Sequence, residues 1–397
     1  MKRTVLKLTA VTLSAIAVFV VSDRNTQAEL GAAPVAPQDK PVEQVRKNIK
    51  VLTGLPDSQL IPVMNFMSAS LGRRCNFCHV TDKGRDGYAL DDKPEKNTAR
   101  EMIKMVMGLR KQSFHGADEI SCFTCHRGQT HPVNVPALPL PTPSPRPATP
   151  TRGGEPPAGG PGAQATPGAQ AAPSATPALP SADEVFAKYL AAIGGQTNLD
   201  RIKSRALKGT IAQPNGTITV NVLQTPPNKF HIAASTPTGD FERAFNGTLG
   251  WEKGPQGVRQ LSPSEVAQLQ NAIGLFRHIK LKEQFTSTRV RAGQRIGDRA
   301  TVMVIGTMAD NRQERLFFDA ESGLLLRRIG YMTTLLGIIP DQIDFEDYRD
   351  VDGVKFPFTV RVSTIEVNNP VSTRTFSEMK LNTPADDAKF NMPAGTP

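Results

Sequence analysis

The chain has 397 residues, a formal net charge of +10 and an isoelectric point of about 9.5. This length is ample for two domains. The basic residues are dispersed, and no cluster of them is interleaved with aromatic residues, so the charge indicates a solvated surface and argues against a nucleic-acid-binding protein.

Residues 1–28 read as an export signal. A basic start is followed by an apolar run from about Leu8 to Val21 and then by polar residues, with Ala28 as the cleavage residue. The run is short for a stable span of the bilayer, which favours cleavage. Retention as an uncleaved membrane anchor is the alternative, because Thr26 and Gln27 make the cleavage site imperfect. We therefore expect a periplasmic protein, which is membrane-associated if this segment is retained.

Three parts follow the signal, so the sequence predicts a multidomain protein. Residues 40–132 contain every cysteine and are expected to be helical. Residues 133–182 are rich in Pro, Ala and Gly, a composition that cannot bury a core and that predicts a disordered, extended linker. Residues 183–397 regain apolar content and are expected to form mainly strands.

Two helices are predicted between residues 40 and 132. The first has Asp57 as its cap and runs to Leu71, where Gly72 ends it. The second opens with the capping-box pattern Thr98–Glu101 and runs to about Lys111. Each helix carries methionine and precedes one cysteine motif, so this part is an internal repeat.

All four cysteines lie in two copies of one motif, C-x-x-C-H, at Cys75–His79 and Cys122–His126. This is the covalent attachment sequence for haem c. The spacing lets one helical turn carry both thiols, and the following histidine can ligate the iron from the proximal side. The sequence therefore predicts two covalently bound haem c groups, attached to Cys75, Cys78, Cys122 and Cys125 and ligated through iron by His79 and His126.

A redox dithiol and a zinc site are the other common uses of paired cysteines. A dithiol needs no histidine after it. A zinc site of four thiolates gives no reason for a histidine after each pair. Both interpretations are therefore less favoured than haem attachment.

Methionines on the two helices are candidate distal ligands: Met64 and Met67 on the first, and Met102, Met105 and Met107 on the second. Methionine on a helix is usually core packing. However, the distal face of a haem must be covered, and a thioether there favours reduced iron. We expect at least one of these methionines to ligate each iron and the others to belong to the core.

A family resemblance lies in the stretch from Val51 to Met64 before the first motif, and in Ala99–Met105 followed by Cys122–Gly128. This is a resemblance of residues 45–132 to the cytochrome c subunit of photosynthetic reaction centres. It implies an all-α dihaem c-type cytochrome domain with a role in electron transport and photosynthesis, in which the redox partner is a reaction centre or another membrane electron-transfer complex.

The same resemblance implies which methionines bind metal. In that family the distal methionine sits on the helix before the haem motif, which selects Met64 for the first haem and Met102 for the second. Met67 and Met105, each one turn later, are the next candidates.

The chain also departs from that family, which carries four haems where this sequence has two motifs. A histidine between the second methionine and the following motif ligates the fourth haem there. His115 occupies the similar place, but no fourth motif exists to receive it. We interpret His115 as a loop histidine, with a ligand or proton-linked role as the alternative, and His131 as a surface residue.

Residues 183–397 are predicted to form a β-rich domain. A helix from Ala182 to Ile193 is followed by strands that alternate with turn signals, and a short helix from Pro263 to Ile273 interrupts them. This rhythm of hairpins indicates a large antiparallel sheet or open barrel, closed on one side by helices. His231 and His278 have no cysteine or acidic partners at metal spacing and are interpreted as structural.

The hairpins are expected from three pairs of runs. They are Leu207–Ala212 with Thr217–Gln224, Arg315–Phe318 with Leu324–Gly330, and Ile343–Arg349 with Val354–Val362.

The β-rich domain faintly resembles the lipoprotein-carrier fold of outer-membrane lipoprotein-sorting proteins. The resemblance lies in Phe317–Arg328 and in Ile343–Arg349 followed by Val354–Phe358. It implies a curved sheet with one apolar face, which can contact a lipid or a partner protein. The domain contains no nucleophile motif such as G-x-S-x-G, so a binding or docking module is favoured over an enzyme.

Taken together, these features predict an exported dihaem c-type cytochrome that transfers single electrons between redox partner proteins. It would be an electron carrier and not an enzyme. A dihaem peroxidase, which needs one iron with an open distal position, is one alternative. A lipid-binding or partner-binding protein with an accessory haem domain is the other.

Overall fold

The computed structural model describes residues 39–116, 119–132, 179–214, 216–236, 239–255, 257–262, 265–266, 269, 280–366 and 370–393. The expected export signal and residues 133–178 of the expected linker lie outside the described residues, as does most of the helix expected from Pro263 to Ile273. Within the described part of the chain, no helix is long and apolar enough to cross a membrane.

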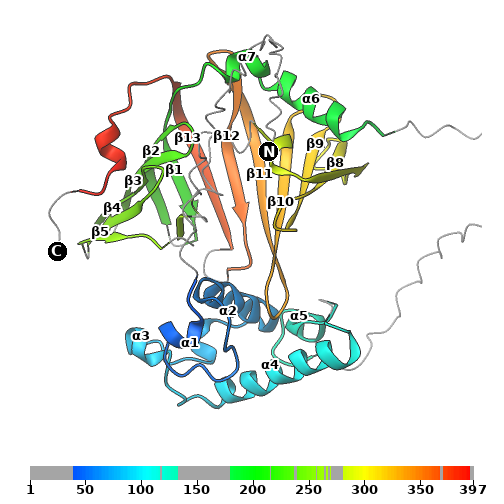
Figure 1. Cartoon of the computed structure of the whole chain (residues 1–397), viewed down its shortest axis with the longest axis vertical. Coiled ribbons are helices and arrows are strands. Elements are labelled where there is room, and N and C mark those ends of the chain that lie inside the picture. Colours follow the sequence, from blue (N-terminus) through cyan, green and yellow to red (C-terminus); the bar gives the residue numbers. More distant parts are fainter. Residues whose placement is uncertain are drawn as a thin grey trace, which may run out of the picture. The chain divides into compact units, whose positions relative to one another are not determined.

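One antiparallel sheet of 13 strands forms in the described part of residues 183–397, which confirms the expected large sheet. Its order is β6-β5-β4-β3-β2-β1-β13-β12-β11-β10-β9-β8-β7. The last strand of the chain therefore lies between β1 and β12 and joins two runs of sequential hairpins (Figure 1).

The strands of the sheet are β1 (Arg205–Gln213), β2 (Gly216–Thr225), β3 (Lys229–Thr236), β4 (Gly239–Phe245), β5 (Gly250–Gly254), β6 (Gly257–Gln260), β7 (Ser287–Ala292), β8 (Thr301–Thr307), β9 (Gln313–Asp319), β10 (Leu325–Thr333), β11 (Ile338–Val351), β12 (Val354–Ser363) and β13 (Val371–Leu381).

All three hairpins expected from turn signals are present, as β1–β2, β9–β10 and β11–β12. At the β11–β12 turn, Asp352 and Gly353 both have positive φ, 53° and 83°. An Asp-Gly pair tolerates this conformation, which matches the twist of the flanking strands. The local turn chemistry of Asp352 and Gly353 thus favours the β11–β12 pairing.

Helices α6 (Ala182–Ala192) and α7 (Gly195–Leu199) pack on the sheet. Ser181 and Glu184 form a capping box at the start of α6, and Gly194 follows the C-cap residue Ile193. Val185, Phe186 and Tyr189 of α6 are buried in one cluster with strand residues. The apolar stripe of α6 therefore covers the apolar face of the sheet.

Residues 39–132 form helices α1 (Val42–Val45), α2 (Asp57–Leu71), α3 (Gly84–Gly87), α4 (Pro94–Ser113) and α5 (Cys122–His126), with a 3₁₀ turn η1 at Cys75–Phe77. Helix α2 ends at Leu71 as expected, and Gly72 ends it in the left-handed conformation with φ 61°.

The expected helix starts were wrong in detail. Asp57 does not cap α2; it is the first helical residue and pairs with Arg46 at 2.7 Å. The Asp39 carboxylate, from a segment outside the helix, accepts a hydrogen bond from Ser58 N at 3.0 Å in the first turn of α2. Helix α4 begins at Pro94, whose fixed φ favours the first turn. Thr98 lies inside α4, and its hydroxyl donates to Pro94 O.

The turn between β10 and β11 contributes to the core of residues 39–132. Arg110 Nη1 donates to Leu335 O at 2.8 Å, and the neighbouring Leu336 is fully buried. A Cβ at Gly337 would lie 2.3 Å from the ring of Phe66, so this position requires glycine. The buried residues of this shared core, the interdomain cluster, are Val42, Leu52, Leu55, Val63, Phe66, Ile103, Leu336 and Ile339.

Candidate functional site

The first motif forms one tight turn at the end of α2. The amides of Cys78 and His79 both donate to Cys75 O, at 3.3 and 3.0 Å. This turn carries both thiols and the histidine on one short segment, as the sequence predicted. Cys75 and Cys78 are half-buried.

One thiol of each pair is buried enough to disfavour its thiolate form. Burial is the main cause that raises the pKa of Cys78, and burial likewise raises the pKa of Cys122. Reactive dithiols have lowered thiol pKa values, which neither of these two cysteines shows. Among the described residues, no three His, Cys, Asp or Glu side chains gather closely enough to hold a metal ion.

His79 is oriented by a backbone carbonyl. Its Nδ1 lies 3.0 Å from Tyr88 O, and its ring packs against the Tyr88 ring at 5.2 Å between centroids. If Nδ1 is the protonated nitrogen, Nε2 is the atom that can ligate a metal. Burial, the largest cause, lowers the pKa of His79 and so favours the neutral, ligating form.

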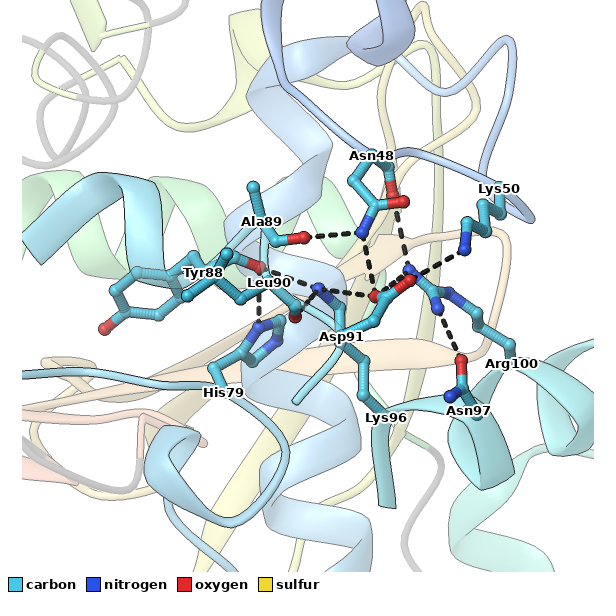
Figure 2. A network of polar contacts seen from close by, with 10 residues as sticks. All are labelled: Asn48, Lys50, His79, Tyr88, Ala89, Leu90, Asp91, Lys96, Asn97 and Arg100. Carbon is cyan, nitrogen blue, oxygen red and sulfur yellow. Dashed lines mark hydrogen bonds and ion pairs between the residues drawn. The ribbon is translucent and has the colours of Figure 1, made fainter. Parts of the chain in front are cut away.

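A network of polar contacts surrounds this carbonyl (Figure 2). The Lys96 ammonium donates to Tyr88 O at 2.9 Å and to Leu90 O at 2.6 Å. It also lies 3.3 Å from the Asp91 carboxylate. Burial is the first cause that lowers the pKa of Lys96, and Asp91 opposes this shift.

Asp91 is the hub of the network. It accepts from Arg100 at 2.9 Å, from Lys50 at 2.7 Å and from Asn48 at 2.8 Å. The bond from Arg100, followed by the bond from Lys50, holds the pKa of Asp91 far below its ordinary value. Three cations thus converge on one carboxylate behind the first motif.

The second motif is built more locally. Ser121 caps α5, and its backbone N–H donates to Thr124 Oγ1 at 3.0 Å. His126 Nδ1 lies 3.0 Å from Gln129 O, so this histidine also presents Nε2. Cys125 is exposed, whereas Cys122 packs against the interdomain cluster.

The end of α2 connects the two motifs. Gly128, just beyond the second motif, donates its N–H to Ser70 O of α2 at 2.8 Å. A Cβ on Gly72 would lie 2.1 Å from Gly128 O. Helix α2 therefore positions the segment after the second motif while leading directly into the first.

The candidate methionines fall into two environments. Met64, Met67 and Met107 are partly buried against the interdomain cluster. Met102 and Met105 lie on the outer face of α4, with 37% and 45% of their surface exposed. The structure thus brings Met64 and Met67 to the same cluster. The assignment of Met64 and Met102 as distal ligands, in preference to Met67 and Met105, stays a prediction.

The remaining histidines have different settings. His115 and His131 are exposed, and His115 occupies the turn after α4 with φ 50°. His231 Nε2 lies 3.0 Å from Glu242 Oε2 on the neighbouring strand, an acidic partner that the sequence reading missed because the pair is formed across strands. His278 lies outside the described residues.

A cavity of about 540 Å³ lies beside the first motif. Its lining combines three basic residues, Arg73, Arg74 and Lys93, with one acidic residue, Glu95, and the ring of Phe77. Arg73 also stacks over the Phe77 ring at 5.2 Å. An apolar ring beside several cations suits a flat ligand that carries acidic groups.

Sequence reasoning missed the network around Tyr88 O. One signal was present: on α4 the buried face repeats at Lys96, Arg100, Ile103, Val106 and Arg110. Basic residues on a buried stripe need an acidic or carbonyl partner. The partner itself, the segment from Tyr88 to Asp91, could not be located without the tertiary structure.

Comparison with known proteins confirms the resemblance predicted for the cysteine-containing part of the chain. Residues 11–153 match the family described as the photosynthetic reaction centre cytochrome C subunit. The photosynthetic reaction center cytochrome c subunit of Rubrivivax gelatinosus (strain NBRC 100245 / IL144) is 31% identical over 117 residues, which cover 28% of this chain and 30% of that protein. The chain therefore matches less than a third of the length of this curated relative.

The β-rich part is similar to solved structures. A DUF1329 family protein from Desulfovibrio piger has 10% identity and a TM-score of 0.40, covering 53% of this chain and 96% of that one. A LolA superfamily protein from Nitrosomonas europaea has 14% identity and a TM-score of 0.40, covering 54% of this chain and 99% of that one.

Proposed function

We propose that the chain is an exported dihaem c-type cytochrome that transfers single electrons. One observation carries this proposal: the same arrangement occurs twice, a one-turn C-x-x-C-H segment whose histidine Nδ1 lies 3.0 Å from a backbone carbonyl. The match of residues 11–153 to the reaction centre cytochrome family supports it.

The donor sets fit haem c. Cys75 and Cys78 would hold the first group and Cys122 and Cys125 the second, each by thioethers. His79 and His126 would ligate iron through Nε2, because the carbonyls at Nδ1 fix the ring orientation. Haem supplies one-electron Fe(III)/Fe(II) chemistry when bound.

Met64 and Met102 are proposed as the distal ligands, with Met67 and Met105 as the next candidates. A distal thioether favours Fe(II) and raises the reduction potential. The role of the protein is then to attach, orient and cover the haems. No bond of a substrate is made or broken, so the protein would be an electron carrier.

The cavity beside the first motif is where we propose that one edge of the first haem lies. Arg73, Arg74 and Lys93 line it and can pair with acidic substituents such as propionates. Phe77 supplies an apolar ring in the same lining.

The cellular setting follows from the same proposal. We place the protein in the periplasm, attached to the membrane if residues 1–28 are retained. Its partners would be redox proteins, including a reaction centre or another membrane complex. The β-rich part is proposed as a docking module that contacts a lipid or a partner protein, since the sheet has an apolar face covered in part by α6.

The decisive experiment counts covalent haem. The purified protein should keep two haems through acid–acetone extraction, and replacing Cys75 and Cys78 with alanine should leave one. The matched variant replaces Cys122 and Cys125 and should leave the other. Extraction of all haem from the unmodified protein would refute the proposal.

A further inference from the structure

The two motif histidines are held alike, but their acceptor carbonyls differ. Tyr88 O accepts from His79 and also from the Lys96 ammonium at 2.9 Å. Gln129 O accepts from His126, and within the described residues no lysine or arginine side chain donates to it. A carbonyl oxygen has two lone pairs, so Tyr88 O can serve both donors at once.

Lys96 cannot easily leave this position. Its side chain is only 10% exposed and makes a second bond, to Leu90 O. Asp91 holds the ammonium from the other side, and Arg100 and Lys50 in turn hold Asp91 (Figure 2). The network carries three cations and one anion, so its net charge is positive.

Two effects of this cation have the same sign. A hydrogen bond from a ligating histidine to its acceptor raises the basicity of the ring. A second, charged donor on the same carbonyl draws electron density from it, which weakens that acceptor and makes the ring less basic. A less basic ligand favours Fe(II). A buried positive charge nearby also disfavours the more positive Fe(III) state.

We infer that Lys96 is a positioning residue that raises the reduction potential of the haem at Cys75–His79 and leaves the haem at Cys122–His126 unaffected. This inference rests on the proposed function, because it concerns the proximal ligand of the first haem. It adds a residue outside both motifs that makes the two sites unequal.

The test uses the full-length holoprotein with Lys96→Met, which keeps an apolar stem and removes the ammonium. A spectroscopic redox titration of the two haems is fitted with two midpoint potentials. Each potential is assigned by comparison with the variants that lack one cysteine pair. We expect the first-haem potential to fall and the second to stay at the unmodified value.

The matched control is Lys104→Met on the same helix. Lys104 is exposed and pairs with Glu101 at 2.9 Å, so this change removes the same charge without touching Tyr88 O. It should leave both potentials unchanged. If Lys96→Met does not fold, Lys96→Gln decides, since it removes the charge but keeps a polar side chain; it should also lower the first-haem potential.

Two outcomes would overturn the inference: an unchanged first-haem potential in the folded Lys96 variant, or equal falls of both potentials. Failure of the proposed function would look different, because the unmodified protein would then carry no covalent haem and give no haem titration.

Discussion

The two C-x-x-C-H segments are identical as motifs, yet the protein supports them differently. In the second, His126 bonds the carbonyl of Gln129, only three residues away. In the first, His79 bonds the carbonyl of Tyr88, nine residues away; this carbonyl also accepts from Lys96, which in turn pairs with Asp91. A local turn is enough for the second site, whereas the first depends on tertiary contacts. Identical haem motifs can therefore have unequal chemistry.

The largest expected effect is the loss of a distal ligand at one site only. Met64→Ala should remove His/Met coordination at the first haem and lower its potential, because a thioether favours Fe(II). Met102→Ala should do the same at the second. Redox titration and the Met–iron charge-transfer band measure both changes. An unchanged band in Met64→Ala would move the assignment to Met67, and in Met102→Ala to Met105.

Next in size is the turn that joins the β-rich part to the haem part. Leu336 is fully buried in the interdomain cluster, so Leu336→Ala should lower the free energy of unfolding by about 2–5 kcal/mol. Denaturant unfolding, followed by helical circular dichroism, measures it. The matched control, Ile338→Ala, truncates an exposed residue of the same hairpin and should change stability little. Equal stability of both variants would contradict a shared core.

A smaller effect is expected where α2 meets the second motif. Gly72→Ala places a Cβ 2.1 Å from Gly128 O at a residue with φ 61°, so it should destabilise by roughly 1–3 kcal/mol. Gly108→Ala is the control, because the Cβ meets no atom within 4 Å and alanine favours the helix. Thermal unfolding compares the two. Equal melting temperatures would show that the Gly72–Gly128 contact is not needed.

The smallest expected effect is on the acid sensitivity of the melting temperature, and it concerns the network behind the first motif. Arg100 and Lys50 hold the folded-state pKa of Asp91 below its ordinary 3.8. Ionised Asp91 therefore stabilises the fold above about pH 4, and this contribution is lost as the pH falls further. Asp91→Asn should make the melting temperature less sensitive to acid. Asp86→Asn, which removes an exposed pair with Lys47, should keep the acid sensitivity of the unmodified protein.

Much of the architecture was predictable because its signals are local. The end of α2 followed from Gly72, which tolerates the left-handed conformation that ends a helix. The β11–β12 hairpin followed from Asp352 and Gly353 for the same reason. The C-x-x-C-H turns were predictable too, since a spacing of two residues needs only one turn of backbone. Helix starts were less predictable, because Asp39 serves α2 from outside the helix.

The sequence by itself determined where the two C-x-x-C-H segments proposed to hold haem lie, since that motif depends only on spacing within five residues. Only the tertiary structure decided what surrounds them. It placed β13 between β1 and β12, brought Leu336 into the core of the helical part, and gathered Lys96 and Asp91 behind His79. These contacts join segments far apart in the chain. No local propensity encodes such contacts. They form because buried apolar side chains must pack against other apolar groups and buried charges must be paired, and the partners come from whichever segments the fold brings near.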